Sequence, residues 1–191
     1  MPTPPRTSRQ DIVAAARRIL ESDGLEQLTM QRVATEVGVR APSLYKHVRD
    51  RGDLIRLVGN DTALELADRL DEATAGILEP GLAIAALARA HRAFTQSHPQ
   101  SYRLLFADLP AGWRIDADAN ARAADALFWA VEGLVGQDHA LEAARTVVAW
   151  AHGFATMELA GAFRLGGDVD SAFDFGVATL TAAIADRHTT A

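Results

Sequence analysis

The sequence contains no cysteine, which excludes a disulfide scaffold, a cysteine nucleophile and a zinc–thiolate or iron–sulfur site. Only 14 of its 191 residues are glycine, and no sustained alternation of apolar and polar residues indicates a β-sheet. No apolar run approaches the roughly 20 residues that a membrane-spanning helix needs, and the first seven residues lack the apolar core of a signal peptide. We therefore expect an all-α, cytoplasmic protein with no membrane partner.

Charge is distributed unevenly along the chain, whose net charge is −6. Residues 1–60 hold ten Lys and Arg against seven Asp and Glu, a net of +3. Residues 61–191 hold nine against eighteen, a net of −9. The N-terminal part, residues 1–60, is thus basic and the remainder, the body of the protein, is acidic. This favours a polyanionic partner for the N-terminal part alone. Chance clustering explains three excess charges about equally well.

Helical periodicity of the apolar residues runs through most of the chain and indicates about nine helices. The composition changes after Glu79-Pro80-Gly81, where the sequence becomes rich in alanine. We expect an N-terminal three-helix domain over residues 9–58 and a helical C-terminal domain over residues 59–191. The helices expected in the second domain cover residues 82–97, 102–106, 118–135, 139–164 and 168–187.

The segment from Thr29 to Lys46 has the pattern of a helix-turn-helix. Thr29 stands where a helix N-cap is expected, and Gly38 supplies the turn between two short helices. Ala34 has the small side chain that two closely crossing helices need. The second helix of such a motif enters the major groove of DNA. Helical hairpins are also common in protein cores, so this pattern alone leaves both interpretations open.

A family resemblance rests on a longer series of residues: Leu28-Thr29-Met30, Val33-Ala34, Val37-Gly38-Val39, the run Ala41 to Val48, and Asp53-Leu54. In type and spacing this series resembles the N-terminal domain of the tetracycline-repressor (TetR) family of regulators, over residues 9–58. Two positions depart from the commonest pattern of the family. Val48 stands where Phe is usual, and Arg51 stands where Lys is usual, which keeps a cation at the start of the fourth helix.

The resemblance implies a set of DNA contacts. Thr29 and Gln31, at the start of a helix, can hold a phosphate, and the cluster Tyr45-Lys46-His47 resembles the phosphate clamp of the family. Arg40 and Ser43 are the candidates for contacts to base edges, although Arg40 could contact phosphate alone. Tyr45 could instead be a hydrophobic plug and His47 a helix cap. The expected DNA-binding residues are Thr29, Gln31, Arg40, Ala41, Pro42, Ser43, Tyr45, Lys46, His47 and Arg51, and Arg6 and Arg9 could add contacts from the N-terminal arm.

The last two predicted helices are apolar on two sides, so each has two surfaces to bury. In the resembled family the last two helices build a four-helix dimer interface; a helix buried centrally in one subunit is the alternative. The segment Trp150-Ala151-His152-Gly153 also resembles a signature of one TetR subgroup. The residues expected in a homodimer interface are Val148, Ala155, Leu159, Phe173, Val177, Leu180 and Ile184.

A ligand pocket is expected in the body, because regulators of this kind keep a cavity there. Trp113 is the favoured residue, since it lies in a loop between Gly112 and Arg114, whereas an aromatic on a helix stripe is more often part of the core. No cluster of cations accompanies the aromatics, which favours a neutral, mostly apolar effector. The expected pocket residues are His98, Tyr102, Phe106, Trp113, Trp129, Trp150 and Phe154. The six histidines show no i, i+4 pair, so we expect no metal and no cofactor.

The resemblance implies a homodimeric transcription regulator, most often a repressor, that binds a near-palindromic operator and is released by a small molecule. Two other classes are weaker. A helical enzyme could use His152 with Glu158, or Asp108 with Trp113, but residues six apart face different sides of a helix, and no phosphate loop or nucleophile elbow is present. A helical adaptor that does not bind DNA would fit a neutral or acidic N-terminal part better. We expect no enzymatic activity.

Overall fold

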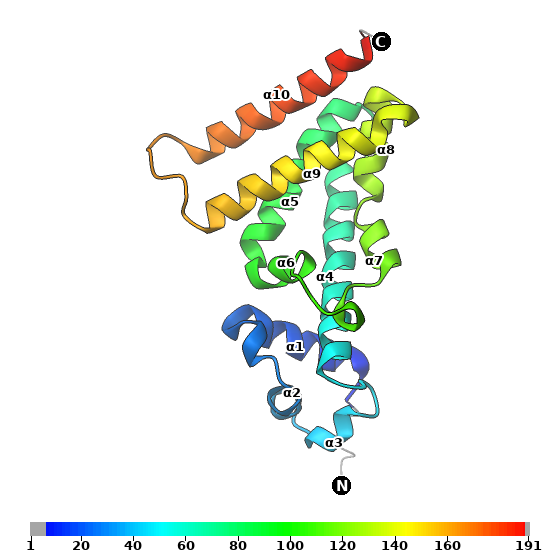
Figure 1. Cartoon of the computed structure of the whole chain (residues 1–191), viewed down its shortest axis with the longest axis vertical. Coiled ribbons are helices and arrows are strands. Elements are labelled where there is room, and N and C mark those ends of the chain that lie inside the picture. Colours follow the sequence, from blue (N-terminus) through cyan, green and yellow to red (C-terminus); the bar gives the residue numbers. More distant parts are fainter. Residues whose placement is uncertain (1–6, 190–191) are drawn as a thin grey trace. The chain divides into compact units, whose positions relative to one another are not determined.

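The structure, a computed structural model, describes the backbone of residues 7–189 and the side chains of residues 7–186. All regular structure within this range is helical, with ten α-helices and two short 3-10 turns (Figure 1). The all-α prediction is confirmed. No helix within the described range is both long enough and apolar enough to cross a lipid bilayer.

The chain forms two compact units. Unit 1 comprises Met1–Leu64 together with His98–Asn120, and unit 2 comprises Glu65–Ser97 together with Ala121–Ala191. The internal segment 98–120, which the sequence places in the C-terminal domain, therefore packs with the N-terminal helices. The physical reason is burial: Leu104 and Leu109 belong to the same apolar core as the N-terminal helices.

Unit 1 contains the predicted helix-turn-helix. Helix α1 begins after a capping box, in which the Ser8 hydroxyl accepts a hydrogen bond from the Asp11 N–H and the Asp11 carboxylate accepts one from the Ser8 N–H. Gly24 ends this helix, and Thr29 caps the next. The elements of unit 1 are α1 (Arg9–Asp23), η1 (Leu25–Gln27), α2 (Met30–Glu36), α3 (Ala41–Leu44), the first part of α4 (Arg51–Thr74), α6 (Pro99–Leu105), η2 (Ala111–Trp113) and the start of α7 (Ala117–Arg122).

The segment 98–120 is attached to α1 by a carboxylate at the start of α6. The Glu21 carboxylate accepts hydrogen bonds from the N–H of Gln100 at 3.1 Å and of Ser101 at 2.7 Å. These N–H groups have no partner within their own helix, and an acidic group at this end also suits the helix dipole. The α1 helix thereby fixes where α6 begins.

Unit 2 is a packed group of four long helices, in which α9 and α10 lie side by side (Figure 1). They are α5 (Pro80–Ser97), α8 (Asp125–Val135), α9 (Gln137–Leu159) and α10 (Val169–Thr189). The stretch 118–135, predicted as one helix, is divided into α7 and α8 by a turn in which the Ala124 N–H bonds to the Ala121 carbonyl. No glycine or proline marks this break, so the sequence does not signal it.

An aromatic cluster around Phe173 forms part of the core of unit 2. Phe173 is buried to 1 % exposure and lies 5.2 Å from the Trp150 ring and 5.1 Å from the Phe154 ring, measured between ring centroids. Arg92 of α5 packs its guanidinium over the Phe173 ring at 4.7 Å and pairs with the carboxylates of Glu158 and Asp170. Arg92 therefore ties α5 to the end of α9 and to the start of α10.

Candidate nucleic-acid interface

The turn between α2 and α3 is fixed by backbone geometry. Gly38 adopts a φ of 71°, a region that glycine reaches without the steric strain of a side chain. Its N–H donates to the Thr35 carbonyl at 3.1 Å, and the Val39 N–H donates to the Ala34 carbonyl at 2.9 Å. Leu44 is fully buried, so it anchors α3 to the core from its inner side. The turn and this anchor together determine which residues of α3 face outward.

The outward surface begins at Arg40, the N-cap residue of α3. Arg40 and Pro42 are exposed, whereas Ala41 and Ser43 are half-buried. The Arg40 carbonyl accepts from the Ser43 N–H at 2.8 Å, whereas its guanidinium makes no hydrogen bond or ion pair among the described residues and is available as a bidentate donor. An arginine on the outside of a helix-turn-helix has the geometry that reading a guanine edge requires.

A basic groove follows α3. It has a volume of about 320 Å³, and its lining includes Tyr45, Lys46, His47, Arg49 and Arg9. The Tyr45 side chain is 55 % exposed, Lys46 and Arg49 are exposed, and His47 is half-buried. The structure therefore brings the predicted Tyr45-Lys46-His47 cluster together with two further cations. Arg49 was not among the predicted residues, although its place three positions after the only lysine is the signal that would have identified it. Arg6 lies outside the described residues.

Asp53 holds two arginines, Arg49 and Arg56, at this groove. Its buried carboxylate accepts hydrogen bonds from the Arg49 N–H at 3.0 Å, from the Arg49 guanidinium at 3.2 Å and from Arg56 at 2.8 Å. Burial raises the pKa of Asp53, but these hydrogen bonds outweigh it and hold the pKa well below its usual range. Asp53 is therefore ionised at neutral pH, and it orients Arg49 at the groove.

Thr29 and Gln31 lie at the start of α2. The Thr29 hydroxyl caps α2 by accepting from the Arg32 N–H at 3.3 Å, which leaves its own proton free to donate. Gln31 is exposed on the first turn. Both positions are compatible with the predicted phosphate contact at a helix N-terminus.

Arg51, predicted to contact DNA, uses its guanidinium within unit 1, and its contact with DNA stays a prediction. Its Nε donates to the Leu28 carbonyl and its Nη2 to the Leu25 carbonyl, both at 2.7 Å. Its guanidinium also lies 5.5 Å from the centre of the Trp113 ring. The side chain thus turns toward the corner between α1 and α2, because two carbonyls and an aromatic face there satisfy it better than water does.

Trp113, the favoured pocket residue, packs on α4, and its role in a ligand pocket stays a prediction. Its indole covers the start of α4 at Gly52, so closely that a Cβ built on Gly52 would lie 2.1 Å from the indole Nε1. The loop position of Trp113 therefore docks the loop on α4. Gly52 beside Arg51 was the available signal, because a glycine inside a helix indicates close approach of another group.

The other predicted pocket residues are divided between the two units. In unit 1, His98 lines an open hollow with Arg17 and Asp61, and the buried Tyr102 ring lies 5.1 Å from the exposed Phe106 ring. In unit 2, Trp150 and Phe154 belong to the aromatic core around Phe173, whereas Trp129 is exposed on α8. Trp150 and Phe154 are partly buried and pack against Phe173, and the pocket role of the aromatic set stays a prediction.

The predicted dimer residues differ in how far the single chain exposes them, and their place in an interface stays a prediction. Ala155, Phe173 and Val177 are buried inside unit 2, so their side chains are occupied within their own subunit. Leu159, Leu180 and Ile184 are half-buried, and of the seven only Val148 is exposed, with 40 % of its surface accessible. Both helices carry apolar residues on several faces, and periodicity alone does not tell which face packs inward.

Both α9 and α10 nonetheless expose apolar side chains. Phe175 is 74 % exposed on α10, and Met157 and Val148 are exposed on different sides of α9. Ala172, Ala178 and Ala182 of α10, at helical spacing from Phe175, are exposed as well. Exposed apolar residues that lie together on a helix are typical of a protein–protein contact.

The residue pairs considered for an enzyme are engaged elsewhere. Glu158 pairs with Arg92, whose hydrogen bond lowers the Glu158 pKa. Asp108 is fully exposed, and Trp113 covers Gly52. Among the residues with described side chains, no group of three or more His, Asp and Glu could hold a metal ion.

Comparison with known proteins gives two family matches. Residues 12–58 match the model described as bacterial regulatory proteins of the tetR family. Residues 84–180, half of the chain, match the tetracyclin repressor-like C-terminal domain.

Individual relatives agree with these matches. An uncharacterised HTH-type transcriptional regulator of Mycobacterium tuberculosis is 32 % identical over 98 % of this chain and 85 % of its own. The repressor DrrR1 of Streptomyces coeruleorubidus is 35 % identical over 50 % of this chain and 34 % of its own. The solved structure of BioQ from Mycobacterium smegmatis superimposes with a TM-score of 0.71 and 28 % identity, covering 95 % of this chain and 99 % of that one. The structure of a Rhodococcus protein of unknown function superimposes with a TM-score of 0.80 at 25 % identity, covering 96 % of this chain and 100 % of that one.

The matched residues 12–58 contain the turn at Gly38, α3 and most of the basic groove, and the second match extends through the helices of unit 2. The chain is a DNA-binding transcriptional regulator of the TetR family.

Proposed function

We propose that this regulator is a cytoplasmic repressor that binds a near-palindromic operator as a homodimer and leaves it when a small molecule binds. One observation carries the proposal: the surface of α3 presents Arg40, and the groove behind it gathers Lys46, Arg49 and Arg9. Phosphate contacts supply most of the affinity of such a surface, and one or two base contacts supply its specificity. The similarity of half of the chain to the repressor DrrR1 supports repression rather than activation.

A homodimer follows from the requirement for specificity. The α3 helix is only four residues long, so a single copy reaches few base pairs. Two copies related by a two-fold axis double the contacts and require half-sites spaced by about one helical turn. The exposed surface of α9 and α10 that includes Phe175 is the surface we assign to this two-fold contact. In such an interface the same patch serves both partners.

The test is binding of the full-length protein to DNA from upstream of its own coding sequence, measured by fluorescence anisotropy across a salt series. We expect log Kd to change with log salt by several units per dimer. Lys46→Gln should weaken binding to all sequences and lower the slope by about one for each phosphate that Lys46 neutralises.

Arg103→Gln is the matched control for the Lys46 variant. Arg103 is exposed on α6, away from the groove, and its replacement changes the charge by the same amount. This control should leave both affinity and slope unchanged. Affinity independent of salt, or an equal effect in the two variants, would refute the proposed mode of binding.

A further inference from the structure

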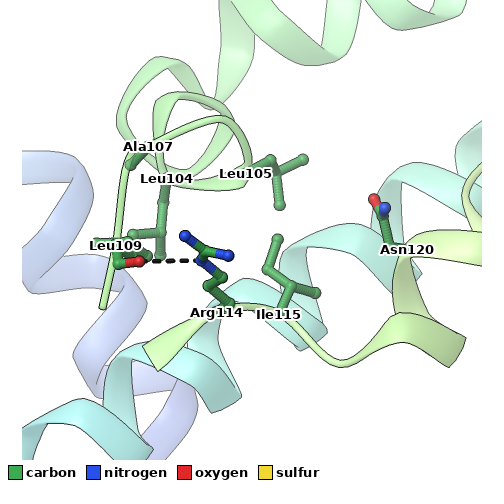
Figure 2. Close-up of a pocket in the computed structure, with 7 residues that line it drawn as sticks. All are labelled: Leu104, Leu105, Ala107, Leu109, Arg114, Ile115 and Asn120. Carbon is green, nitrogen blue, oxygen red and sulfur yellow. Dashed lines mark hydrogen bonds between the residues drawn. The ribbon is translucent and has the colours of Figure 1, made fainter. Parts of the chain in front are cut away.

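A small cavity lies in the segment between α6 and α7 (Figure 2). It has a volume of about 210 Å³, which is below the roughly 300–1,000 Å³ of pockets for drug-sized ligands and so favours a small molecule. All of its lining residues belong to unit 1, the unit that carries the helix-turn-helix. They are Leu104, Leu105, Ala107, Leu109, Arg114, Ile115 and Asn120.

The walls of the cavity are mostly aliphatic. Leu104 and Leu109 are buried, and Leu105 and Ile115 are half-buried. Helix α4 approaches Ile115 at Gly59, where an added Cβ would lie 2.9 Å from the Ile115 side chain, so the glycine makes room for it. Such walls gain free energy by covering an apolar group of a ligand.

One cation accompanies these walls. Figure 2 places the Arg114 guanidinium in the centre of the view, among the side chains of Leu104, Leu105, Leu109 and Ile115. Its Nε donates to the Leu109 carbonyl at 3.0 Å, which orients the group.

The remaining donors of Arg114 have little to bind within the protein. The nearest carboxylate oxygen, from the fully exposed Asp108, is 3.9 Å away, beyond hydrogen-bonding distance. Since a guanidinium has five N–H donors and one of them is used, Arg114 can still form a bidentate pair with a planar anion. Its side chain is 65 % exposed, so the anionic end of a ligand would remain near water.

We propose that this cavity binds a small monocarboxylate with an apolar tail, with its carboxylate on Arg114 and its tail against Leu105 and Ile115. The exposed Asn120 carboxamide, on the first turns of α7, supplies a further polar group at the cavity. A neutral apolar molecule would give the oriented guanidinium no anionic group to bind. A larger anion would exceed the volume of the cavity.

The cavity is connected to the helix-turn-helix through neighbouring residues of its own wall. Trp113 precedes Arg114 and packs on Gly52 and on Arg51, which in turn holds the Leu25 and Leu28 carbonyls at the corner before α2. A ligand that displaces Arg114 therefore acts on the residues that position α2. This regulatory part rests on the proposed binding of an operator.

A second connection follows Ile115. The Asp116 carboxylate accepts from the Arg56 guanidinium at 2.5 and 2.7 Å and from the Asn60 amide at 2.6 Å, and its N–H donates to the Asn60 side-chain oxygen at 2.8 Å. Arg56 also binds Asp53, which orients Arg49 at the basic groove. Both ends of the wall segment thus contact side chains that shape the DNA-binding surface.

Isothermal titration calorimetry on the full-length protein tests the site directly. The probes are hexanoate, octanoate and 3-phenylpropanoate, each compared with the corresponding primary alcohol. We expect at least one carboxylate to bind on the order of tenfold or more tighter than its alcohol, since hydrogen bonds to a charged group are the stronger ones. Arg114→Gln should remove this preference, and Arg103→Gln, at an exposed arginine of the same unit, should keep it.

Ala107→Phe provides a second variant, because it fills the cavity from an exposed loop position and leaves the buried leucines in place. It should abolish binding of the carboxylate, with circular dichroism verifying that the helices are retained. The site is refuted if no carboxylate binds, if carboxylate and alcohol bind equally, or if the Arg114 and Arg103 variants behave alike.

Anisotropy with operator DNA separates the site from its regulatory role. The bound carboxylate should lower operator affinity in the wild type and leave it unchanged in Arg114→Gln, because coupling between two sites is reciprocal. A carboxylate that binds without changing operator affinity overturns the regulatory part alone. Absence of operator binding without any ligand overturns the proposed function, while calorimetry still decides on the site.

Discussion

Arg51 and Lys46 offer a test in which stability and DNA binding should separate. The sequence pattern places both as cations facing DNA, but the structure turns Arg51 to the Leu25 and Leu28 carbonyls and leaves Lys46 exposed in the basic groove. We therefore expect Arg51→Gln to change the free energy of unfolding and Lys46→Gln to change the salt dependence of operator binding.

The magnitude for Arg51 follows from its two hydrogen bonds and its ring contact. A hydrogen bond from a charged donor is worth about 1.5–3 kcal/mol, and a cation–π contact at a partly exposed site about 0.5–1 kcal/mol. Because the side chain is half-exposed and water replaces part of these interactions in the variant, we expect a destabilisation of about 2–4 kcal/mol. For a chain of this length that corresponds to a fall in Tm of roughly 4–16 °C.

The two assays are thermal unfolding and operator binding across a salt series. Arg51→Gln should lower Tm and leave the salt slope unchanged, whereas Lys46→Gln should lower the slope by about one for each phosphate it neutralises and leave Tm unchanged. Arg51→Lys retains the charge but cannot reach both carbonyls as a planar guanidinium does, so it should be destabilised as well. If Arg51→Gln lowered the salt slope at unchanged Tm, Arg51 would be a phosphate contact and the structural account would be wrong.

Three further outcomes are expected. Arg40→Ala should weaken operator binding by about 1–3 kcal/mol per half-site and relax specificity at one base pair, and equal weakening for all operator variants would instead indicate a phosphate contact. Phe175→Glu should give folded monomers by light scattering, whereas Leu78→Glu, at an exposed leucine outside the α9–α10 face, should remain dimeric; a dimeric Phe175 variant would place the interface elsewhere. Burial, helped by the charge of His152, lowers the pKa of His91 to about 4. The folded protein therefore holds His91 neutral while the unfolded chain binds a proton near pH 6.5, so stability is lost as the pH falls from 6.5 toward 4, by up to about 3 kcal/mol. His91→Gln should remove this loss of stability between pH 6.5 and 4, measured by unfolding titrations at each pH. The same substitution at the exposed His139 should not.

The helix-turn-helix could be predicted because short-range chemistry determines it. The Thr29 hydroxyl caps α2, and Gly38 takes the positive φ that the turn needs. Leu44 and Val48 lie four residues apart and both face the core. Each signal lies within a few residues of the feature that it predicts, so no knowledge of the tertiary structure was required.

The attachment of segment 98–120 to unit 1 could not be predicted in the same way. It depends on contacts between distant parts of the chain, such as Glu21 with the start of α6 and Arg56 with Asp116. Apolar periodicity identifies a helix but not its partner. The packing of Arg51 and Trp113 could not be predicted for this reason, since each residue's contacts come from a segment more than twenty positions away.

The burial of the predicted interface residues could not be read from the sequence for a related reason. Helix α10 carries Phe173 and Phe175 two positions apart, on different sides of the helix, and the sequence treats them as equally apolar. The distinguishing signal is Gly176, where an added Cβ would lie 2.4 Å from the Trp150 ring. A glycine at that point indicates that α10 presses on α9 there, which places Phe173 inside the subunit and leaves Phe175 outside. The same reasoning that moves Phe173 into the core selects Phe175 as the residue whose substitution should separate the two copies.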